Sequence, residues 1–152
     1  MISWLAIALP FVKDQEGCVL IAYPDPVSGG EPWTIGYGAT GPDIIQGTVW
    51  TQEQADNDLE TRLRGLGAEI TRHATVPLNP NQMAALVDFA YNLGITALLD
   101  STLWILLNRG DYDEAADQFP RWCHAFNRVI PDLLRRRNEE RALFLSPVTQ
   151  NG

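Results

Sequence analysis

Residues 23–50 have the sequence YPDPVSGGEPWTIGYGATGPDIIQGTVW, which separates a strand-forming part of the chain from a helix-forming part. Proline and glycine recur along it between short aromatic and β-branched pieces, of which 33–35 (Trp-Thr-Ile) and 48–50 (Thr-Val-Trp) are the clearest. Proline and glycine mark turns, whereas aromatic and β-branched residues favour strands. The stretch therefore predicts a small antiparallel sheet of hairpins.

Everything after residue 50 indicates helix. Thr51 and Gln54 fit a capping box, in which each side chain bonds the backbone N–H of the other residue. One apolar stripe at helical spacing follows: Ala55, Leu59, Leu63, Leu66 and Ile70. This spacing predicts a long helix over 51–72.

A second helix begins at 79–80 (Asn-Pro), where proline at the first helical position costs no hydrogen bond. Its residues 83–93 are apolar on nearly every face, which is typical of a buried helix, and Gly94 ends it. Shorter helices are expected over 101–109 and from 111, and a last one begins at 131.

The first twelve residues are uncharged and mostly apolar. No basic residue precedes Lys13, and the apolar run is too short for a signal peptide or for a helix that spans a membrane. We therefore expect a short N-terminal helix that docks on the core, no export route and no stable membrane insertion. Glu16-Gly17 is expected to end this helical stretch.

These patterns predict an α+β fold in one domain, because 152 residues suit a single core. A lobe with a small sheet is expected over about 13–50, with an interlobe helix over about 51–72. A helical lobe is expected over about 73–146, and the N-terminal helix 1–12 joins it.

Charge and composition exclude several classes of partner. The net charge is −8, with nine acidic residues and one basic residue among 1–60 and a surplus of arginine after 120. An acidic protein is a poor binder of nucleic acid or anionic lipid. Two cysteines and two isolated histidines indicate neither a disulfide framework nor a metal site, and both thiols are expected to be reduced and partly buried.

Glu16 and Asp25 are the candidate pair for acid–base chemistry. Two carboxyl groups that face each other can hydrolyse a glycosidic bond, because one protonates the leaving oxygen while the other activates water or stabilises the cationic centre. The spacing alone is weak, since Glu16 suits a helix end and Asp25 suits a turn between two prolines.

The residues around this pair resemble the phage-type lysozymes, a family of endolysins. The resemblance lies in 16–17 (Glu-Gly), 22–26 (Ala-Tyr-Pro-Asp-Pro) and 33–41 (Trp-Thr-Ile-Gly-Tyr-Gly-Ala-Thr-Gly), and further similar blocks extend it over residues 11–145. It implies a lysozyme-like fold with Glu16 as general acid, Asp25 as the water-activating or charge-stabilising carboxylate, and Thr34 as a hydroxyl that positions water. Thr34 could instead be an ordinary strand residue.

The resemblance also implies the activity: a cofactor-free and metal-free muramidase that hydrolyses the β-1,4 bond between N-acetylmuramic acid and N-acetylglucosamine, with inversion. Such an enzyme would be a monomer that waits in the host cytoplasm, reaches periplasmic peptidoglycan after holin-dependent release, and lyses the bacterium. Two alternatives stay open, namely a chitin-directed glycosidase and a non-catalytic wall-binding or structural protein on the same scaffold.

Three aromatic residues near the pair could stack on sugars or pack the sheet, namely Tyr23, Trp33 and Tyr37. The interval from Asp25 to Thr34 is three residues longer than the shortest family pattern, and 29–30 (Gly-Gly) can absorb this as a wider hairpin tip.

The last helix carries an arginine triplet, 135–137, that is expected to lie on a solvated face. In it Arg135/Glu139 and Arg136/Glu140 form pairs at i,i+4 spacing. We expect the basic segment 121–141 to attract the anionic cell wall.

Overall fold

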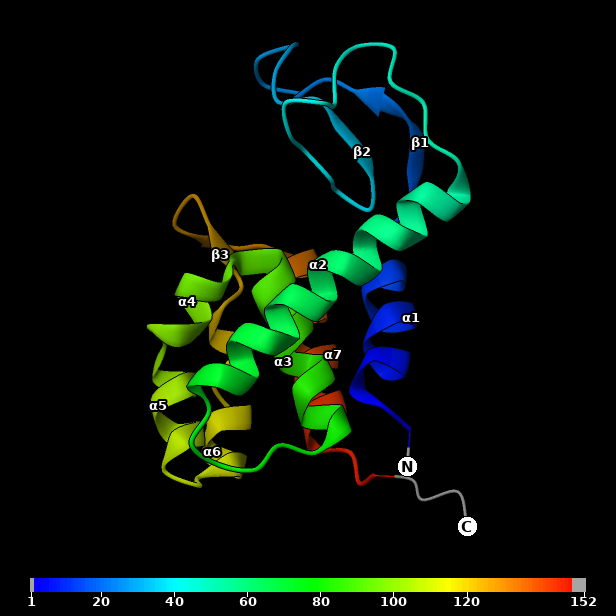
Figure 1. Cartoon of the computed structure of the whole chain (residues 1–152). Coiled ribbons are helices and arrows are strands. Elements are labelled where there is room, and N and C mark those ends of the chain that lie inside the picture. The colour runs from blue at the N-terminus through cyan, green and yellow to red at the C-terminus, as the bar shows by residue number, and fades with distance from the viewer. Residues whose placement is uncertain (1, 149–152) are drawn as a thin grey trace. The chain divides into compact units, whose positions relative to one another are not determined.

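The computed structural model describes residues 2–148, which form two compact units (Figure 1). The sheet unit comprises Leu9–Arg62, and the helical unit comprises the described residues on either side of it.

The elements follow in chain order. They are α1 (Trp4–Glu16), β1 (Val19–Tyr23), β2 (Thr34–Gly36), α2 (Gln52–His73), α3 (Pro80–Leu93), α4 (Ile95–Leu99), α5 (Thr102–Asn108), α6 (Tyr112–Ala116), the 3-10 helix η1 (Phe119–Arg121), β3 (His124–Ala125), β4 (Arg128–Val129) and α7 (Pro131–Leu145). The observed order confirms the predicted α+β class, with strands early and helices dominating afterwards.

In the sheet unit, β1 and β2 pair in antiparallel fashion. The segment 48–50 runs along the other edge of β1, where Ala22 N–H donates to the Thr48 carbonyl and Trp50 N–H donates to the Leu20 carbonyl, both at 2.9 Å. A small core forms beneath from Ala22, Ile35, Ala39 and Ile44, with Trp33 and Trp50 packed against it. The two pieces expected to be strands, 33–35 and 48–50, thus both contribute to this sheet.

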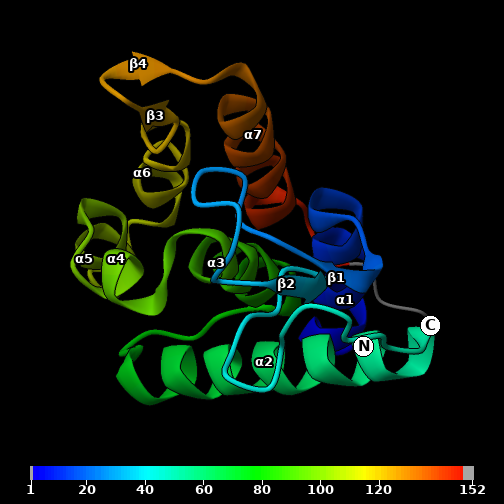
Figure 2. The ribbon, with the colours of Figure 1, turned by 90° about the horizontal axis from the view of Figure 1, so that it is seen from above.

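In the helical unit, α3 is the buried element, and it runs beside α7 (Figure 2). All eight residues from Met83 to Ala90 are buried. Asn79 and Gln82 form a capping box at its start, and Gly94 follows its end with φ +98°. Phe89 meets Phe119 and Trp122 edge to face, at ring centroid distances of 5.8 and 5.4 Å. The predicted buried central helix is confirmed.

The arginine triplet of α7 differs from expectation. The Arg135–Glu139 pair forms at 3.0 Å on the surface, but Arg136 and Arg137 are buried. Arg136 makes two hydrogen bonds to the Asp88 carboxylate of α3, and Arg137 pairs with Glu140. The expected solvated face is therefore confirmed for Arg135 and wrong for Arg136 and Arg137, which α7 buries, and the Arg136/Glu140 pair is wrong because Arg136 bonds Asp88 instead.

Burial first, and the neighbouring Asp88 carboxyl next, raise the pKa of Glu140 well above its ordinary value, although Arg137 opposes the shift. Burial opposes the ionisation of Glu140 because a buried carboxylate loses its hydration, whereas the Arg137 guanidinium favours it.

Three further elements were not expected. β1 precedes the turn-rich stretch, α4 is only five residues long, and the β3–β4 hairpin interrupts a part of the chain that was predicted to be wholly helical. The α4 helix and the two-residue strands β3 and β4 are too short to show a periodicity, and β1, with the sequence VLIAY, shows no alternation of apolar and polar residues. The hairpin turns through Phe126 and Asn127, which both have positive φ, so no glycine marks it.

Among residues 2–148, no helix is both long enough and apolar enough to cross a membrane.

Candidate active site

Glu16 is the last residue of α1 and is half-buried. The helix ends directly after it because Gly17 adopts φ +69°, a left-handed conformation in which its N–H donates to the Lys13 carbonyl at 3.1 Å. Glycine ends helices in this way because it has no Cβ to strain the turn. The predicted end of the first helix at Glu16-Gly17 is confirmed, and this carboxyl group stands on a rigid helix terminus.

Asp25 follows β1 and organises the loop that leads to β2. Its Oδ2 accepts hydrogen bonds from the N–H groups of Val27 and Ser28 at 3.2 and 2.9 Å. Its backbone closes the same loop, since its N–H donates to the Gly30 carbonyl and its carbonyl accepts from Gly29 N–H. The carboxyl group is therefore held in one orientation by its own turn, and Oδ1 accepts no such bond within residues 2–148.

The three additional residues of this loop are absorbed locally. Gly29 adopts φ +72°, and the Ser28 hydroxyl donates to the Glu31 carbonyl at 2.8 Å. The chain therefore folds back on itself before it reaches the second strand, and Thr34 still pairs with Tyr23 in the sheet register.

Thr34 is the first residue of β2 and is half-buried. Because Tyr23 lies opposite it and Asp25 comes two residues after Tyr23, Thr34 and Asp25 lie at the same end of the β1–β2 pair. Glu16 precedes the other end of β1. The register thus brings Thr34 and Asp25 to one end of the pair, with Glu16 before the opposite end of the strand.

Tyr37 occupies the tip of a tight turn rather than an open sugar platform. Ile35 and Ala39 exchange two backbone hydrogen bonds, at 2.9 and 2.8 Å, and the glycines between them both have positive φ. A Cβ on Gly36 would lie 3.0 Å from the Trp50 ring, so this position has no room for a side chain. Tyr37 itself is only 6% exposed, which favours the packing alternative for this residue.

The Tyr37 hydroxyl belongs to a polar network that also contains Lys13, Gln52 and Asp56. It donates to Asp56 Oδ1 at 3.1 Å and accepts from Gln52 Nε2 at 3.0 Å. Lys13 pairs with Asp56 at 3.3 Å and lies over the Tyr37 ring at 5.7 Å. Because Lys13 is three residues before Glu16 on α1, the network anchors the helix end that carries the candidate acid.

The network shifts the pKa values of Asp56 and Tyr37 in opposite directions. The hydrogen bond from Gln52 is the largest cause that lowers the pKa of Asp56, and the Lys13 ammonium lowers it further. Burial, followed by the hydrogen bond to Asp56, raises the pKa of Tyr37. The network is therefore set with Asp56 ionised and Tyr37 neutral.

The other two aromatic candidates differ in exposure. Tyr23 is 40% exposed, whereas Trp33 is half-buried against the small core. Tyr23 can therefore meet a ligand directly, and Trp33 can do so only with the part of its ring that remains outside the core.

Comparison with known proteins decides the family. The family model described as phage lysozyme matches residues 13–140. The chain belongs to the phage lysozyme family. Its α+β fold is accordingly the lysozyme-like fold that the sequence resemblance implied.

Two similar proteins are endolysins of phages. The endolysin of Bacillus phage PZA is 37% identical over 140 residues, which cover 92% of this chain and 54% of the relative. The endolysin of Salmonella phage P22 is 41% identical over 140 residues, which cover 89% of this chain and 92% of the relative. The chain thus spans about half the length of the Bacillus phage endolysin that it matches.

Solved structures share the fold over almost the whole chain. The muramidase domain of SpmX from Asticaccaulis excentricus has a TM-score of 0.84 at 34% identity, and the match covers 93% of this chain and 96% of that domain. The crystal structure of P22 lysozyme mutant L86M has a TM-score of 0.83 at 36% identity, covering 96% of this chain and 100% of that one.

Sequence reasoning missed the polar network behind Glu16. Gln52 and Asp56 stand four residues apart on α2, and this spacing is a usable signal for one helix face, but their partners come from other elements. Cys18 was also misjudged, because it is exposed and its sulfur accepts a long hydrogen bond of 3.9 Å from Gln52. Cys123 is buried, as expected of a packing thiol.

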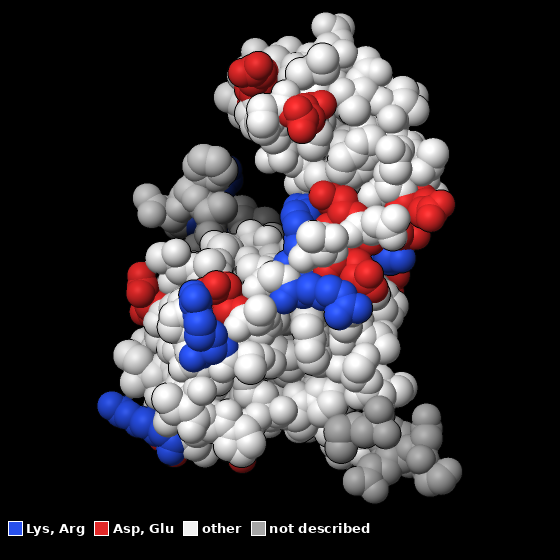
Figure 3. Space-filling view, viewed as in Figure 1, with Lys and Arg blue, Asp and Glu red and all other residues white. Residues whose placement is uncertain are grey.

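The sheet unit carries a strong negative charge. Its bases are Lys13 and Arg62, and each is paired with a carboxylate of the same unit. Acidic and basic side chains intermix along α2, whereas only acidic ones show over the strands and loops of the unit (Figure 3). The field around the candidate carboxyl groups therefore favours cations.

Proposed function

We propose that this phage lysozyme is an endolysin muramidase, which hydrolyses the β-1,4 bond between N-acetylmuramic acid and N-acetylglucosamine in bacterial peptidoglycan. The observation that carries the proposal is the pair of fixed carboxyl groups within the family motif. Glu16 ends a helix that is anchored by a polar network, and Asp25 is held by two N–H donors of its own loop.

In the proposed reaction Glu16, in its protonated form, donates its proton to the glycosidic oxygen as the bond between that oxygen and the anomeric carbon breaks. Asp25 accepts a proton from a water molecule whose oxygen bonds to the anomeric carbon. The Thr34 hydroxyl forms a hydrogen bond with this water and thereby orients it toward the anomeric carbon. Hydrolysis leaves muramic acid at the new reducing end, and solvent returns the two carboxyl groups to their starting protonation states.

We propose inversion at the anomeric carbon. Direct attack by a water that Asp25 activates displaces the leaving group from the opposite face, whereas a retaining enzyme would need a covalent sugar–carboxylate intermediate. Two features support the water-activating role. Thr34 begins the strand at the same end as Asp25, and Asp25 Oδ2 is already occupied by backbone donors, which leaves Oδ1 for water.

The biological setting follows from the same proposal. The enzyme acts on peptidoglycan glycan strands as a monomer, needs no cofactor, metal or nucleic acid, and accumulates in the host cytoplasm until a holin gives it access to the periplasm. Its action on the cell wall lyses the host.

The test is hydrolysis of purified peptidoglycan by wild type and by Glu16→Gln, with mass spectrometry of the fragments. We expect muramic acid at the reducing ends from wild type and a loss of about 10²–10⁴-fold in kcat from the variant, because a general acid contributes about this much. Circular dichroism checks that the variant folds.

Other outcomes would name another activity. Anhydro ends would show a lytic transglycosylase, released peptides an amidase or peptidase, and cleavage of chitin alone a different N-acetylhexosamine substrate. Tight binding without any cleavage would show a wall-binding protein. Full activity in Glu16→Gln would refute the assignment of the acid.

A further inference from the structure

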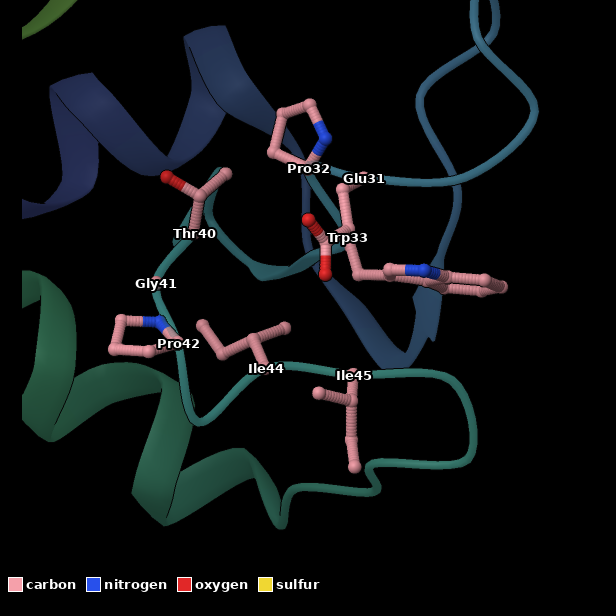
Figure 4. A pocket seen from close by; sticks show the side chains of 8 residues that line it. All are labelled: Glu31, Pro32, Trp33, Thr40, Gly41, Pro42, Ile44 and Ile45. Carbon is pink, nitrogen blue, oxygen red and sulfur yellow. The ribbon is translucent and has the colours of Figure 1, made fainter.

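The sheet unit contains a cavity of about 460 Å³ whose lining includes none of the three proposed catalytic residues. This volume lies within the range of about 300–1,000 Å³ in which small ligands bind. Two segments line the cavity, one before β2 and one after the Tyr37 turn (Figure 4). The lining residues are Glu31, Pro32, Trp33, Thr40, Gly41, Pro42, Ile44 and Ile45.

The walls of the cavity are mainly apolar and firmly supported. Trp33 packs against the small core, and Ile44 belongs to that core and is 9% exposed. Ile45, which is 56% exposed, extends the apolar wall toward solvent. Two of the apolar side chains in the cavity wall are therefore supported by the small core.

One carboxylate faces this apolar surface. In Figure 4 the Glu31 carboxyl group lies between Thr40 and the Trp33 ring and is directed toward Ile44. Glu31 is exposed, and its carboxylate has no ion pair or hydrogen bond within residues 2–148. Glu31 and Pro32 belong to the lengthened loop, so the additional residues of this chain supply one wall of the cavity.

An apolar wall with a single carboxylate suits an aliphatic chain that ends in a primary ammonium group. The methylene groups can contact Trp33 and the isoleucines, and the ammonium can pair with Glu31. A neutral sugar would form no ion pair with Glu31. The surrounding field adds to this preference, because both bases of the sheet unit already have acidic partners.

We propose that this cavity binds the side-chain amine of the diamino acid in peptidoglycan peptides. This inference rests on the proposed function for its biological substrate, since the peptides hang from the glycan strand that is cleaved. Glu31 is then a specificity residue, and the acidic sheet unit attracts the cationic groups of a polymer whose net charge is negative.

Binding can be measured without any hydrolysis. The probe is N-acetylmuramyl-L-alanyl-D-isoglutaminyl-L-lysine, and the matched probe is the same molecule with its lysine amine acetylated. NMR follows the Trp33 indole N–H, which Trp33→Phe identifies. We expect the free-amine probe to shift this signal in wild type and to bind about two- to fivefold more weakly in Glu31→Gln, as for an exposed ion pair. High salt should remove the difference.

The control variant is Asp43→Asn, which removes the same charge from the neighbouring loop without lining the cavity. It should weaken binding of the free-amine probe less than Glu31→Gln does, because it removes a share of the surrounding field but not the direct ion pair. Equal weakening in both variants would show a general field effect and overturn the contact with Glu31. Equal affinity for the acetylated probe would overturn amine recognition, as would the absence of any shift at Trp33.

Activity gives an independent readout. On untreated peptidoglycan, Glu31→Gln should raise KM by the same two- to fivefold with kcat unchanged, and on amine-acetylated peptidoglycan the two proteins should have equal KM values. If wild type cleaves no peptidoglycan at all, the proposed function fails, while the NMR titration still decides whether the cavity binds the amine.

Discussion

Two glycines of α2 provide a matched test of how Trp4 packs. Gly65 and Gly67 both lie inside the helix, where glycine costs about 0.8–1.0 kcal/mol relative to alanine. A Cβ on Gly65 meets nothing within 4 Å, whereas a Cβ on Gly67 would overlap ring atoms Cζ2 and Cη2 of Trp4. The same substitution should therefore stabilise the protein at one position and fail to stabilise it at another only half a turn away.

Gly65→Ala should stabilise the protein by about 1 kcal/mol, which raises Tm by about 2–4 °C in a chain of this size. Gly67→Ala gains the same helix propensity, but it must displace the indole, and overpacking of this kind costs about 1–3 kcal/mol. The net change at Gly67 should range from about zero to about 2 kcal/mol of destabilisation.

Thermal and urea unfolding followed by circular dichroism measure both variants. A third background, Trp4→Leu, removes the obstructing ring, so Gly67→Ala should there become as stabilising as Gly65→Ala. Stabilisation by Gly67→Ala in the wild-type background, equal to that at Gly65, would refute the close packing of Trp4 on α2.

Four further predictions concern charges and the candidate site. Asp88→Ala should cost about 3–5 kcal/mol in urea unfolding, because it removes the carboxylate that accepts two hydrogen bonds from the buried Arg136 side chain; a cost below about 1 kcal/mol would contradict this. The hydrogen bond from Gln52 is the main cause that lowers the pKa of Asp56 in the folded protein. Ionised Asp56 therefore stabilises the fold fully above pH 3.8, and this stabilisation should vanish as the pH falls through the pKa of the folded state. In acid unfolding curves the stabilities of wild type and Asp56→Asn should then converge. Thr34→Ala should reduce kcat about three- to tenfold, as for one hydrogen bond, while Thr34→Ser retains the wild-type rate. Arg128→Gln should weaken adsorption to cell walls at low salt, with the difference fading at high salt, and an unchanged salt profile would exclude attraction through this residue.

The expected attraction of segment 121–141 to the cell wall depends on which of its arginines are exposed. Arg136 and Arg137 are buried, and Arg135 is shared between Asp132 and Glu139, so these three offer little free positive charge. Arg121 and Arg128 are exposed, and Arg128→Gln tests the attraction through one of them.

Local chemistry made much of the fold predictable. The capping box at Thr51 forms as expected, with hydrogen bonds of 2.7 and 3.1 Å to and from Gln54. Gly17 and Gly94 end their helices because their backbone conformations exclude most other residues. Such signals act within a few residues, so they do not depend on how distant segments pack.

The candidate site divides in the same way. The sequence by itself determined that Glu16 ends a helix, that Asp25 stands in a turn and that Thr34 belongs to a strand, since each follows from neighbouring residues. Only the tertiary structure decided that Tyr37 is buried, that Glu31 faces a cavity, and that Arg136 pairs with Asp88 although 48 residues separate them. Periodicity shows which face of an element is apolar or charged, but packing between distant segments sets the partner of that face. This packing also fixes how deeply each charged side chain is buried, and therefore how strongly it interacts with other charges.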